Sequence, residues 1–363
     1  VNPISGFHNY TGDQSAIIPH AKLQLESVPT PQHDAAKLMY TTGTLTKVNY
    51  IPQKSGQLAA WTHTFSALVV EVDEDGDWFV RQLHADKESG CFYDLGKNYT
   101  PQGVTSDHDI EAVNYGDLHG ISIDSNVEHA CWNGDGNILD TLRPKYQFLH
   151  DTLSHERRNH HNMKCPLYLF RQYSGNAECV REEVEITTAL VAKLDRGFSE
   201  RVIVDSNHDQ ALQKWIVEQD FKKDPVNAIF MLELTLDLYK AVESGKEFHT
   251  FENACRKVDP RMNSVRFLRE DESFRICGNI ECGSHSHNGN NGARGSVMSF
   301  RKLGVKHNIG HSHQCNIKDG VYQSGMSGNL LQGYNKGGSS WSHSHILTYK
   351  NGKRTIITQK GNK

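Results

Sequence analysis

The fold is indicated by a short apolar run that leads into a polar cluster, Ala112-Val113-Asn114-Tyr115-Gly116-Asp117-Leu118-His119-Gly120. The run has the length and composition of a buried strand, and the cluster places an acid and an imidazole two residues apart. From about residue 112 onward, such runs alternate with helix-like stretches, a pattern typical of layered α/β domains. The sequence therefore predicts an α/β fold for this part of the chain.

The same pattern of an apolar run before a polar cluster occurs four more times. The later clusters are His150-Asp151, Asp205-Ser206-Asn207-His208-Asp209, Gly283-Ser284-His285-Ser286-His287 and Gly310-His311-Ser312-His313. Ligand sites in layered α/β folds form just beyond the carboxyl ends of strands, so clusters far apart in sequence converge in space. The five clusters therefore predict one site.

Three stretches between these clusters are expected to be helical. Apolar residues in Glu178–Arg196 recur close to every 3.6 residues, which predicts an amphipathic helix. Asp209–Lys222 and Pro225–Ser244 are also helix-like, the second with a proline near its first turn. Residues 283–295 are rich in Gly, Asn, Ser and His and are expected to form a loop.

The first 111 residues are expected to be β-rich. The best strand candidates are Leu38–Tyr50, Thr62–Val72 and Trp78–Leu83, and the acidic segment 73–77 between the last two has the composition of a hairpin loop. We expect a division into a β-rich segment, 1–111, which could continue an upstream domain, and a catalytic domain, 112–363. The default role of the first segment is to extend the catalytic sandwich, and substrate recognition is the alternative.

Composition narrows the function classes. The 363 residues contain eight scattered cysteines with no CxxC pair, which favours a reducing compartment and predicts a cytoplasmic protein. No apolar run has the roughly 18 to 20 residues of a membrane helix, so no membrane partner is expected. The formal charge of −4 limits nucleic-acid binding to local basic patches or metal-borne charge. The 21 histidines, many in HxH pairs, indicate metal binding.

The order of the clusters resembles the pattern of the calcineurin-like metallophosphoesterase superfamily: DxH, GDxxD, GNH[D/E], a lone His, then GHxH. The matching residues are Asp117 and His119, Asp151, Asn207-His208-Asp209, His285, and His311 with His313. The resemblance covers roughly residues 112–315 and is closest to bacteriophage members that degrade host DNA, and more distant to SbcD-type repair exonucleases. It implies a sandwich of two mixed sheets flanked by helices.

The resemblance also implies a ligand set for two divalent ions. One ion would be held by Asp117, His119 and His313, and Asp151 would bridge to a second ion held by Asn207, His285 and His311. A mixed shell of carboxylate, amide and imidazole suits Mn²⁺, our first choice, and also Fe²⁺, Zn²⁺ or Mg²⁺. His208 would stabilise the transition state or protonate the leaving oxygen, while Asp151 would act in catalysis through the ions it bridges.

The sequence departs from the family pattern at three positions. His150 stands where the family has Gly, His155 where it has the second Asp of GDxxD, and Ser206 where it has the Gly of GNH. The string Gly134-Asp135 competes for the second motif, but it follows Asp117 by only 18 residues, and a parallel crossover with a helix needs about 30. We therefore prefer Asp151, which also follows a strand-like run, with Asp140 as the next candidate.

Several polar residues near the clusters have more than one interpretation. Arg157, Arg158 and His160, just after Asp151, would meet substrate phosphates or lie on a solvated helix face. Arg294, in its Gly-rich loop, is a further substrate-binding candidate. His287 is the alternative to His285 as a ligand. The sequence leaves open whether His343 and His345 line the site or close a C-terminal sheet.

The sequence thus predicts a phage DNA nuclease that degrades host DNA in the host cytoplasm by metal-dependent phosphodiester hydrolysis. A phosphomonoesterase acting on proteins or nucleotides is the main alternative within enzymes. A metal-binding interaction module that has lost catalysis is the alternative from another class, favoured by the departures from the motif. Whether the chain forms a homo-oligomer stays open.

Overall fold

The structure is a computed structural model that describes residues 2–159 and 162–363. Within these ranges the chain is a mixed α/β protein whose two largest sheets have eight and six strands. The larger sheet has the order β1-β3-β2-β16-β17-β15-β14-β13, and the smaller has the order β12-β11-β10-β9-β18-β19. Both combine parallel and antiparallel pairs, as the predicted sandwich of mixed sheets requires.

The strands of the larger sheet come from both ends of the chain. They are β1 (Ala16–Ile18), β2 (Leu25–Val28), β3 (Lys37–Thr41), β13 (Arg275–Ile276), β14 (Ile280–Glu281), β15 (Lys306–Ile309), β16 (Asn316–Lys318) and β17 (Val321–Gln323). The N-terminal strands join the sheet through an antiparallel pairing in which Glu26 lies opposite Asn316. Residues 16–41 therefore extend the sheet that carries β15.

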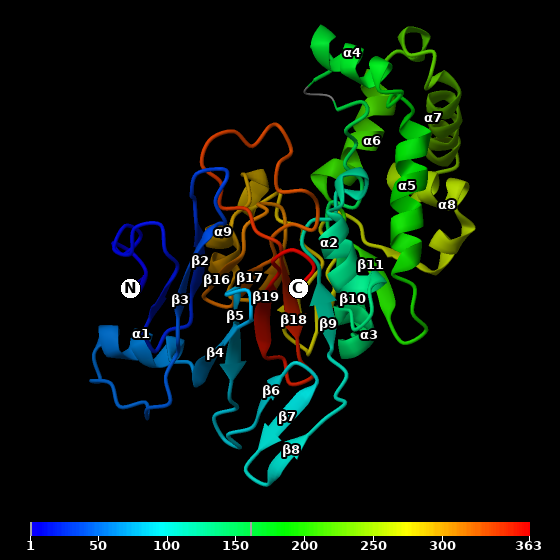
Figure 1. Ribbon diagram of the computed structural model, residues 1–363. Helices are drawn as coiled ribbons and strands as arrows, with labels where there is room; N and C mark the ends of the chain where they lie inside the picture. Colours follow the sequence, from blue (N-terminus) through cyan, green and yellow to red (C-terminus); the bar gives the residue numbers. More distant parts are fainter. Residues whose placement is uncertain (1, 160–161) are drawn as a thin grey trace.

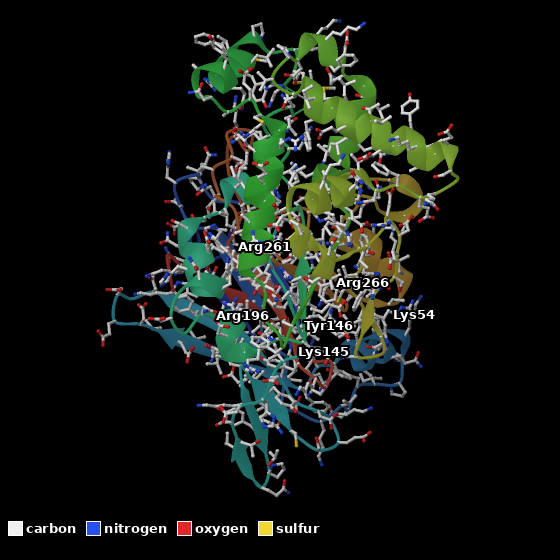
Figure 2. The ribbon with its side chains drawn as sticks, turned by 90° about the vertical axis from the view of Figure 1, so that its right-hand side faces the viewer. Lys54, Lys145, Tyr146, Arg196, Arg261 and Arg266 are labelled. Atoms are coloured by element: carbon white, nitrogen blue, oxygen red, sulfur yellow. The ribbon has the colours of Figure 1, made fainter. Side chains whose placement is uncertain are left out.

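The six-stranded sheet has a parallel centre. Its strands are β9 (Ala112–Asn114), β10 (Tyr146–Leu149), β11 (Glu200–Ile203), β12 (Arg266–Phe267), β18 (Ser344–Thr348) and β19 (Arg354–Thr358). Because β9, β10 and β11 run parallel in neighbouring positions, their carboxyl ends meet at one edge. Figure 2 labels Lys145 and Tyr146 at the opposite end of β10, where the Lys145 ammonium lies 4.8 Å from the Tyr146 ring centroid.

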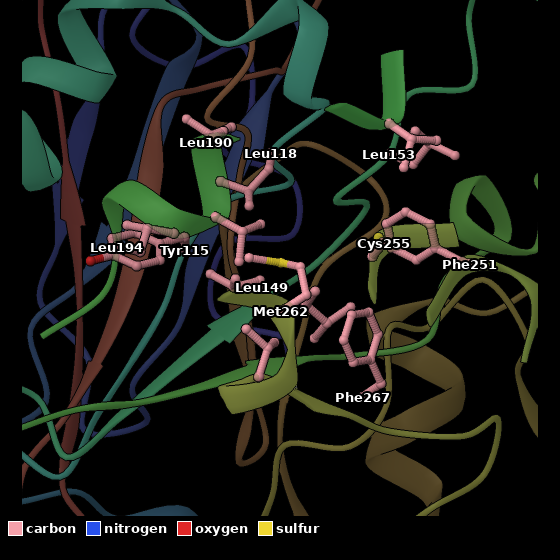
Figure 3. Close-up of a cluster of buried hydrophobic side chains, with 14 of the residues drawn as sticks. Tyr115, Leu118, Leu149, Leu153, Leu190, Leu194, Phe251, Cys255, Met262 and Phe267 are labelled. Atoms are coloured by element: carbon pink, nitrogen blue, oxygen red, sulfur yellow. The ribbon is translucent and has the colours of Figure 1, made fainter. Parts of the chain in front are cut away.

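Helices cover the six-stranded sheet. They include α5 (Val180–Lys193), α6 (Asn207–Glu218), α7 (Ala228–Glu243) and α8 (Thr250–Val258), which group together in Figure 1. The apolar stripe of α5 is buried at Val180, Val184, Leu190 and Val191. Figure 3 shows the core that this packing forms, with Leu149 from β10 near Met262 and Phe267. This core fixes the strand ends that carry the polar clusters.

The remaining elements are shorter or peripheral. They are α1 (Lys54–Thr62), α2 (Ser125–Glu128), α3 (Ile138–Leu142), α4 (Pro166–Ser174), α9 (Val297–Phe300), the hairpin β4 (Ser66–Val72) and β5 (Trp78–His84), and a three-stranded sheet of β6 (Phe92–Asp94), β7 (Lys97–Thr100) and β8 (Gly103–Thr105). None of the helices in the described ranges combines the length and apolar character needed to cross a membrane.

The predicted elements after residue 112 are confirmed with small shifts at their ends. The three expected helices are α5, α6 and α7, and α6 begins two residues early, at Asn207. The hairpin loop is also confirmed, because the Asp73 N–H donates to the Asp77 carbonyl at 2.9 Å while β4 pairs with β5. Residues 283–295 are irregular except for a single 3-10 turn at Asn290–Gly292.

The prediction for the N-terminal segment was wrong in one stretch. The strand expected over Leu38–Tyr50 ends at Thr41, because Gly43 adopts a φ of +68° and redirects the chain. An added Cβ at Gly43 would meet the Ser66 hydroxyl, so the turn also depends on a close approach of the two segments. The unpredicted helix α1 then occupies Lys54–Thr62, which delays the start of the next strand to Ser66.

Candidate metal centre

The first two polar clusters lie side by side because backbone hydrogen bonds continue beyond the ends of β9 and β10. The Leu118 N–H donates to the His150 carbonyl at 2.9 Å, and the His119 N–H donates to the Asp151 carbonyl at 2.8 Å. Gly120 repeats the pattern with the carbonyl of Thr152 at 3.0 Å. The parallel pairing of the strands thus carries Asp117, His119 and Asp151 to one place.

Four side chains form a first group of possible ligands. Asp117, His119, Asp151 and His313 are all buried, and one ligand atom from each lies within 4.8 Å of the others. His313 Nε2 is 3.2 Å from Asp117 Oδ2 and 3.0 Å from His119 Nε2. Carboxylate oxygens and imidazole nitrogens gathered so closely could hold a divalent metal ion.

Asp151 also belongs to a second group, with His285 and His311. His285 Nε2 lies 3.2 Å from Asp151 Oδ1, while Asp151 Oδ2 faces His119 Nε2 at 3.8 Å. The loops of this group are tied together, because the Gly310 N–H donates to the His285 carbonyl at 3.1 Å. The His311 N–H donates to Asp117 Oδ2 at 2.8 Å, which links the second group to the first.

The polar atoms of both groups fit bound cations. Asp117 Oδ1, His311 Nδ1 and Asn207 Oδ1 are buried and make no hydrogen bond within residues 2–159 and 162–363. Asp151 Oδ1 and His285 Nε2 are also buried and face each other at 3.2 Å. A buried polar atom without a partner costs about 1–3 kcal/mol, and more when it is charged. Coordination to a metal ion supplies the missing interaction for all of these atoms at once.

The backbone is strained at the same residues. His119, Asp151, His311 and His313 have φ values of 49°, 43°, 79° and 58°, in the left-handed region that non-glycine residues rarely adopt. Such residues cost on the order of 1–3 kcal/mol each and concentrate at functional sites. Gly310 adds a close approach, because a Cβ there would lie 2.3 Å from Asp117 Oδ1. The backbone at these residues therefore adopts costly conformations that place their side chains in the cluster.

Burial sets the protonation of the imidazoles. It lowers the pKa of His311 to about 3 and that of His313 to about 4, and it holds the pKa of His119 well below its usual value. These side chains are therefore neutral at pH 7 and keep the lone pairs that bind metals. Burial raises the pKa of Asp117 to about 8, while His285 and His208 overcome burial at Asp151 and lower its pKa.

Asn207 and His208 form the first turn of α6, and His208 lies beside the cluster. The His208 ring lies edge-on to the His119 ring, with centroids 4.7 Å apart. His208 Nδ1 donates to the Ser154 carbonyl at 2.7 Å, because a carbonyl oxygen can only accept. This hydrogen bond fixes a hydrogen on Nδ1 and sets the orientation of the ring.

The three residues that depart from the resembled motif pattern are all buried in the structure. Ser206 is the N-cap of α6, since its hydroxyl accepts from the Asp209 N–H. Its hydroxyl also donates to Asp209 Oδ2, whose other oxygen accepts from the Leu153 N–H in the loop after Asp151. His150 is buried and stacks on His285, with ring centroids 5.5 Å apart. His155 is buried beside Trp215.

The competing acids lie outside the cluster. Asp135 is exposed, and Asp140 is bound by the guanidinium of Arg196, labelled in Figure 2, at 2.6 Å. His287, the alternative to His285, is 3.9 Å from Glu270 and belongs to neither group. His343 donates to the Gly328 carbonyl at 3.0 Å. His345, on β18, accepts from the Gly116 N–H and so braces the strand end before Asp117.

Among the expected substrate-binding residues, Arg158 needs correction. It is 4% exposed, and its guanidinium makes two hydrogen bonds to Asp224, at 2.7 and 2.9 Å, and one to Glu178. The charge of Arg158 is therefore neutralised within a buried ion pair, and the expected contact with a substrate phosphate was wrong. Arg157 is bound to Glu182 and the Cys179 carbonyl. Arg294 is exposed and stays a candidate, while His160 lies outside the described residues.

The sequence analysis did not single out two aromatic residues beside the cluster. The Trp341 ring lies edge-on to His313, with centroids 4.3 Å apart, and Tyr334 packs against Trp341 at 5.7 Å. Tyr334 is 59% exposed. In the sequence, both residues lie in or near the Gly-rich segment 333–338. Glycines allow a loop to approach a site closely, so this segment could have indicated the two aromatic residues.

Comparison with known proteins gives a phage relative. The chain is 43% identical to Protein A1 of Escherichia phage T5 over 371 aligned residues, which cover 99% of this chain and 66% of that protein. The chain thus spans just under two thirds of the length of that relative. No family model matches the sequence. No solved structure matches it either. The chain is a homologue of phage T5 Protein A1, with a buried His and Asp cluster that could hold metal ions.

Proposed function

We propose that this chain is a metal-dependent phosphodiester hydrolase that cleaves DNA with the help of two divalent ions. The observation that carries the proposal is the position of Asp151, which belongs to both ligand groups. A carboxylate with one oxygen near His119 and the other near His285 can join two ions into one centre. The bound pair would activate water and neutralise the phosphoryl oxygens during an in-line displacement.

The ligand roles follow from the two groups. Asp117, His119 and His313 would hold one ion, and His285 and His311 would hold the other, with Asp151 between them. Asn207, whose Oδ1 is buried without a partner within the described residues, would complete the second set, as the resemblance implies. Oxygen and imidazole ligands without cysteine suit Mn²⁺ in particular, and also Fe²⁺, Zn²⁺ or Mg²⁺. Neutral His119, His311 and His313 need no deprotonation before they bind, whereas the raised pKa of Asp117 means that metal binding would displace a proton from this carboxyl group.

His208 would act on the leaving group. Ser154 fixes the ring through Nδ1, and contact with His119 keeps the ring next to the first ligand group. A protonated Nε2 in this position can donate to the oxygen that departs as the phosphodiester bond breaks. General acids of this kind contribute typically 10²- to 10⁴-fold to the rate.

Two features support a nucleic acid as the substrate. Trp341 and Tyr334 present aromatic surface beside His313, and nucleobases stack on such side chains for about 1–3 kcal/mol each. The relative is a phage protein, and the motif order resembles phage members that degrade DNA. In a DNA substrate, the phosphate would lie at the ions and an adjacent base would stack against Trp341.

A nuclease assay with Mn²⁺ tests the proposal. We expect the native chain to cut long DNA, and Asp151→Asn and His208→Ala to lose most of that activity. Asp135→Asn and His33→Ala are matched controls, because both positions are exposed and belong to neither ligand group. Equal activity in all five proteins contradicts the proposal. Turnover of phosphopeptides or mononucleotides without cleavage of DNA would instead identify a phosphomonoesterase.

A further inference from the structure

A second pocket, of about 430 Å³, lies away from the candidate metal centre. It collects side chains from distant parts of the chain, among them Trp61 at the end of α1 and Lys306 at the start of β15. His311 lies five residues beyond Lys306, past the other end of that strand. At about 3.3 Å per residue, at most roughly 17 Å of backbone separates Lys306 from His311.

The lining of this pocket is strongly cationic. It contains Lys22, Arg301, Lys306, Lys353 and Arg354, against the single carboxylate of Asp319. That carboxylate is already shared, because Lys22 lies 2.7 Å from one of its oxygens and Arg301 lies 3.0 Å from the other. Five cations facing one acid leave a local surplus of four positive charges in a chain whose formal charge is −4.

Arg354 is the most unusual of these cations. It is only 4% exposed, and within the described ranges no carboxylate lies within ion-pair distance of it. Its guanidinium donates to the carbonyls of His307 at 2.8 Å and Gly320 at 2.7 Å and to Asn308 Oδ1 at 2.9 Å, and it stacks over the Tyr322 ring at 4.0 Å. A buried charge without a counter-charge is costly, so proteins rarely keep one without a ligand to match it.

Two of the three lysines of the pocket, Lys306 and Lys353, form no ion pair with an acidic residue within the described ranges. Burial and the nearby charges of Arg354 and Lys353 lower the pKa of Lys306. His84 adds no charge, because burial lowers its pKa to about 3. An anion in the pocket would therefore relieve repulsion among Lys306, Lys353 and Arg354.

One side of the pocket is aromatic. Trp61 is 75% exposed although it lines the pocket, and α1 has no buried residue along its length. The helix begins at Lys54, labelled in Figure 2. A large exposed indole next to a cationic recess gives a flat apolar surface beside an anion site, and this combination matches a nucleotide, which joins a base to a phosphate.

We infer that this pocket binds the phosphate group of a nucleotide, with Lys306, Lys353 and Arg354 around the phosphate and Trp61 against the base. It is separate from the candidate metal centre, so a phosphate bound here is not the one that reacts. The ligand is a free mononucleotide or one unit of a single-stranded nucleic acid, which share this chemistry. The inference does not depend on the proposed nuclease activity, because it concerns binding alone.

Calorimetric titration of the full chain tests the inference, with EDTA present to prevent turnover. The probes are thymidine monophosphate, a thymidine oligonucleotide and inorganic phosphate. We expect the double substitution Lys306→Ala, Lys353→Ala to weaken binding of all three at least tenfold. Lys302→Ala is the matched control, because it removes an exposed lysine next to the pocket that does not line it. Trp61→Ala should weaken the nucleotides and leave inorganic phosphate unchanged.

The two sources of the phosphate are separated by salt dependence. If a strand occupies the pocket, its affinity exceeds that of the mononucleotide, and the double substitution reduces the slope of log affinity against log salt by about 1.4, or 0.7 for each lost contact. If the mononucleotide is the ligand, the two bind equally.

Unchanged affinity in the double variant overturns the inference. So does loss of binding in Asp151→Asn, which would place the ligand at the metal centre. Thermal unfolding of each variant, and the single lysine substitutions, exclude a folding defect.

Discussion

Asp151 Oδ1 lies 3.2 Å from His285 Nε2, and the carboxylate that makes this contact also belongs to the ligand group of His119. The first consequence concerns metal stoichiometry. We expect the native chain to bind two equivalents of Mn²⁺, and His285→Ala to retain one, because the first group stays intact. Asp151→Asn should weaken both sites. Mass-spectrometric metal analysis after dialysis measures this, with His33→Ala as control, and two tightly bound ions in Asp151→Asn would contradict the shared role.

His208 is expected to affect chemistry without affecting metal content. His208→Ala should lower kcat on DNA by about 10²- to 10⁴-fold, because the leaving oxygen then departs without a proton. The loss should shrink with a nitrophenyl phosphodiester, whose leaving group is stable as an anion. An equal loss on both substrates would argue against proton donation, and a loss of bound Mn²⁺ would assign His208 to metal binding.

Gly310 is expected to tolerate no side chain. In Gly310→Ala the new Cβ would lie 2.3 Å from Asp117 Oδ1, so the buried carboxylate must move away from His313. We expect at least tenfold weaker Mn²⁺ binding and a loss of about 1–3 kcal/mol in the free energy of unfolding, as for other overpacked sites. Gly197→Ala is the matched control, because open space surrounds that position. Native-like metal affinity in Gly310→Ala would contradict the observed packing.

Glu183 makes stability depend on pH. Its carboxylate accepts from the Glu156 and Arg157 N–H groups at 2.9 and 3.0 Å, and burial raises its pKa from 4.5 to about 7. The folded state therefore holds this proton more tightly than the unfolded state. Its contribution to stability is complete below about pH 4.5 and is lost as pH rises through 7, by roughly 3 kcal/mol at about 1.4 kcal/mol per pKa unit.

Glu183→Gln removes this proton equilibrium. We expect a flatter dependence of the free energy of unfolding on pH between 5 and 7, measured by urea denaturation in EDTA so that metal binding adds no pH dependence of its own. Glu185→Gln is the control, since Glu185 is exposed on the same helix. Identical pH profiles for the native chain and Glu183→Gln would show that Glu183 titrates normally in the folded protein.

The sequence predicted the strand ends of the site well, because the signal there is local. An apolar run followed by a polar cluster marks β9, β10, β11 and β15. Parallel pairing aligns the ends of β9, β10 and β11, and the packing of the second sheet adds the end of β15. Asp151 was preferred over Asp135 because of its spacing from Asp117 and because it follows a strand-like run. In the structure Asp151 is buried in the cluster, whereas Asp135 is exposed. The N-cap role of Ser206 was not predicted, because the helix was expected to begin at Asp209 and begins at Asn207.

Long-range pairings could not be predicted in the same way. Arg158 meets Asp224 across 66 residues, and no local pattern distinguishes that ion pair from a free guanidinium. The addition of β1–β3 to the larger sheet depends on the contact between β2 and β16, almost 290 residues apart. The turn at Gly43 depends on the approach of Ser66. Each of these features is decided by tertiary contacts that override local propensity.

The most direct test of the two-ion centre is a crystal structure of the chain soaked with Mn²⁺, with an anomalous-scattering map. The account predicts two peaks about 3.5–4 Å apart on either side of Asp151, one contacted by Asp117, His119 and His313, the other by Asn207, His285 and His311. A single peak, or peaks that none of these residues contacts, would contradict it.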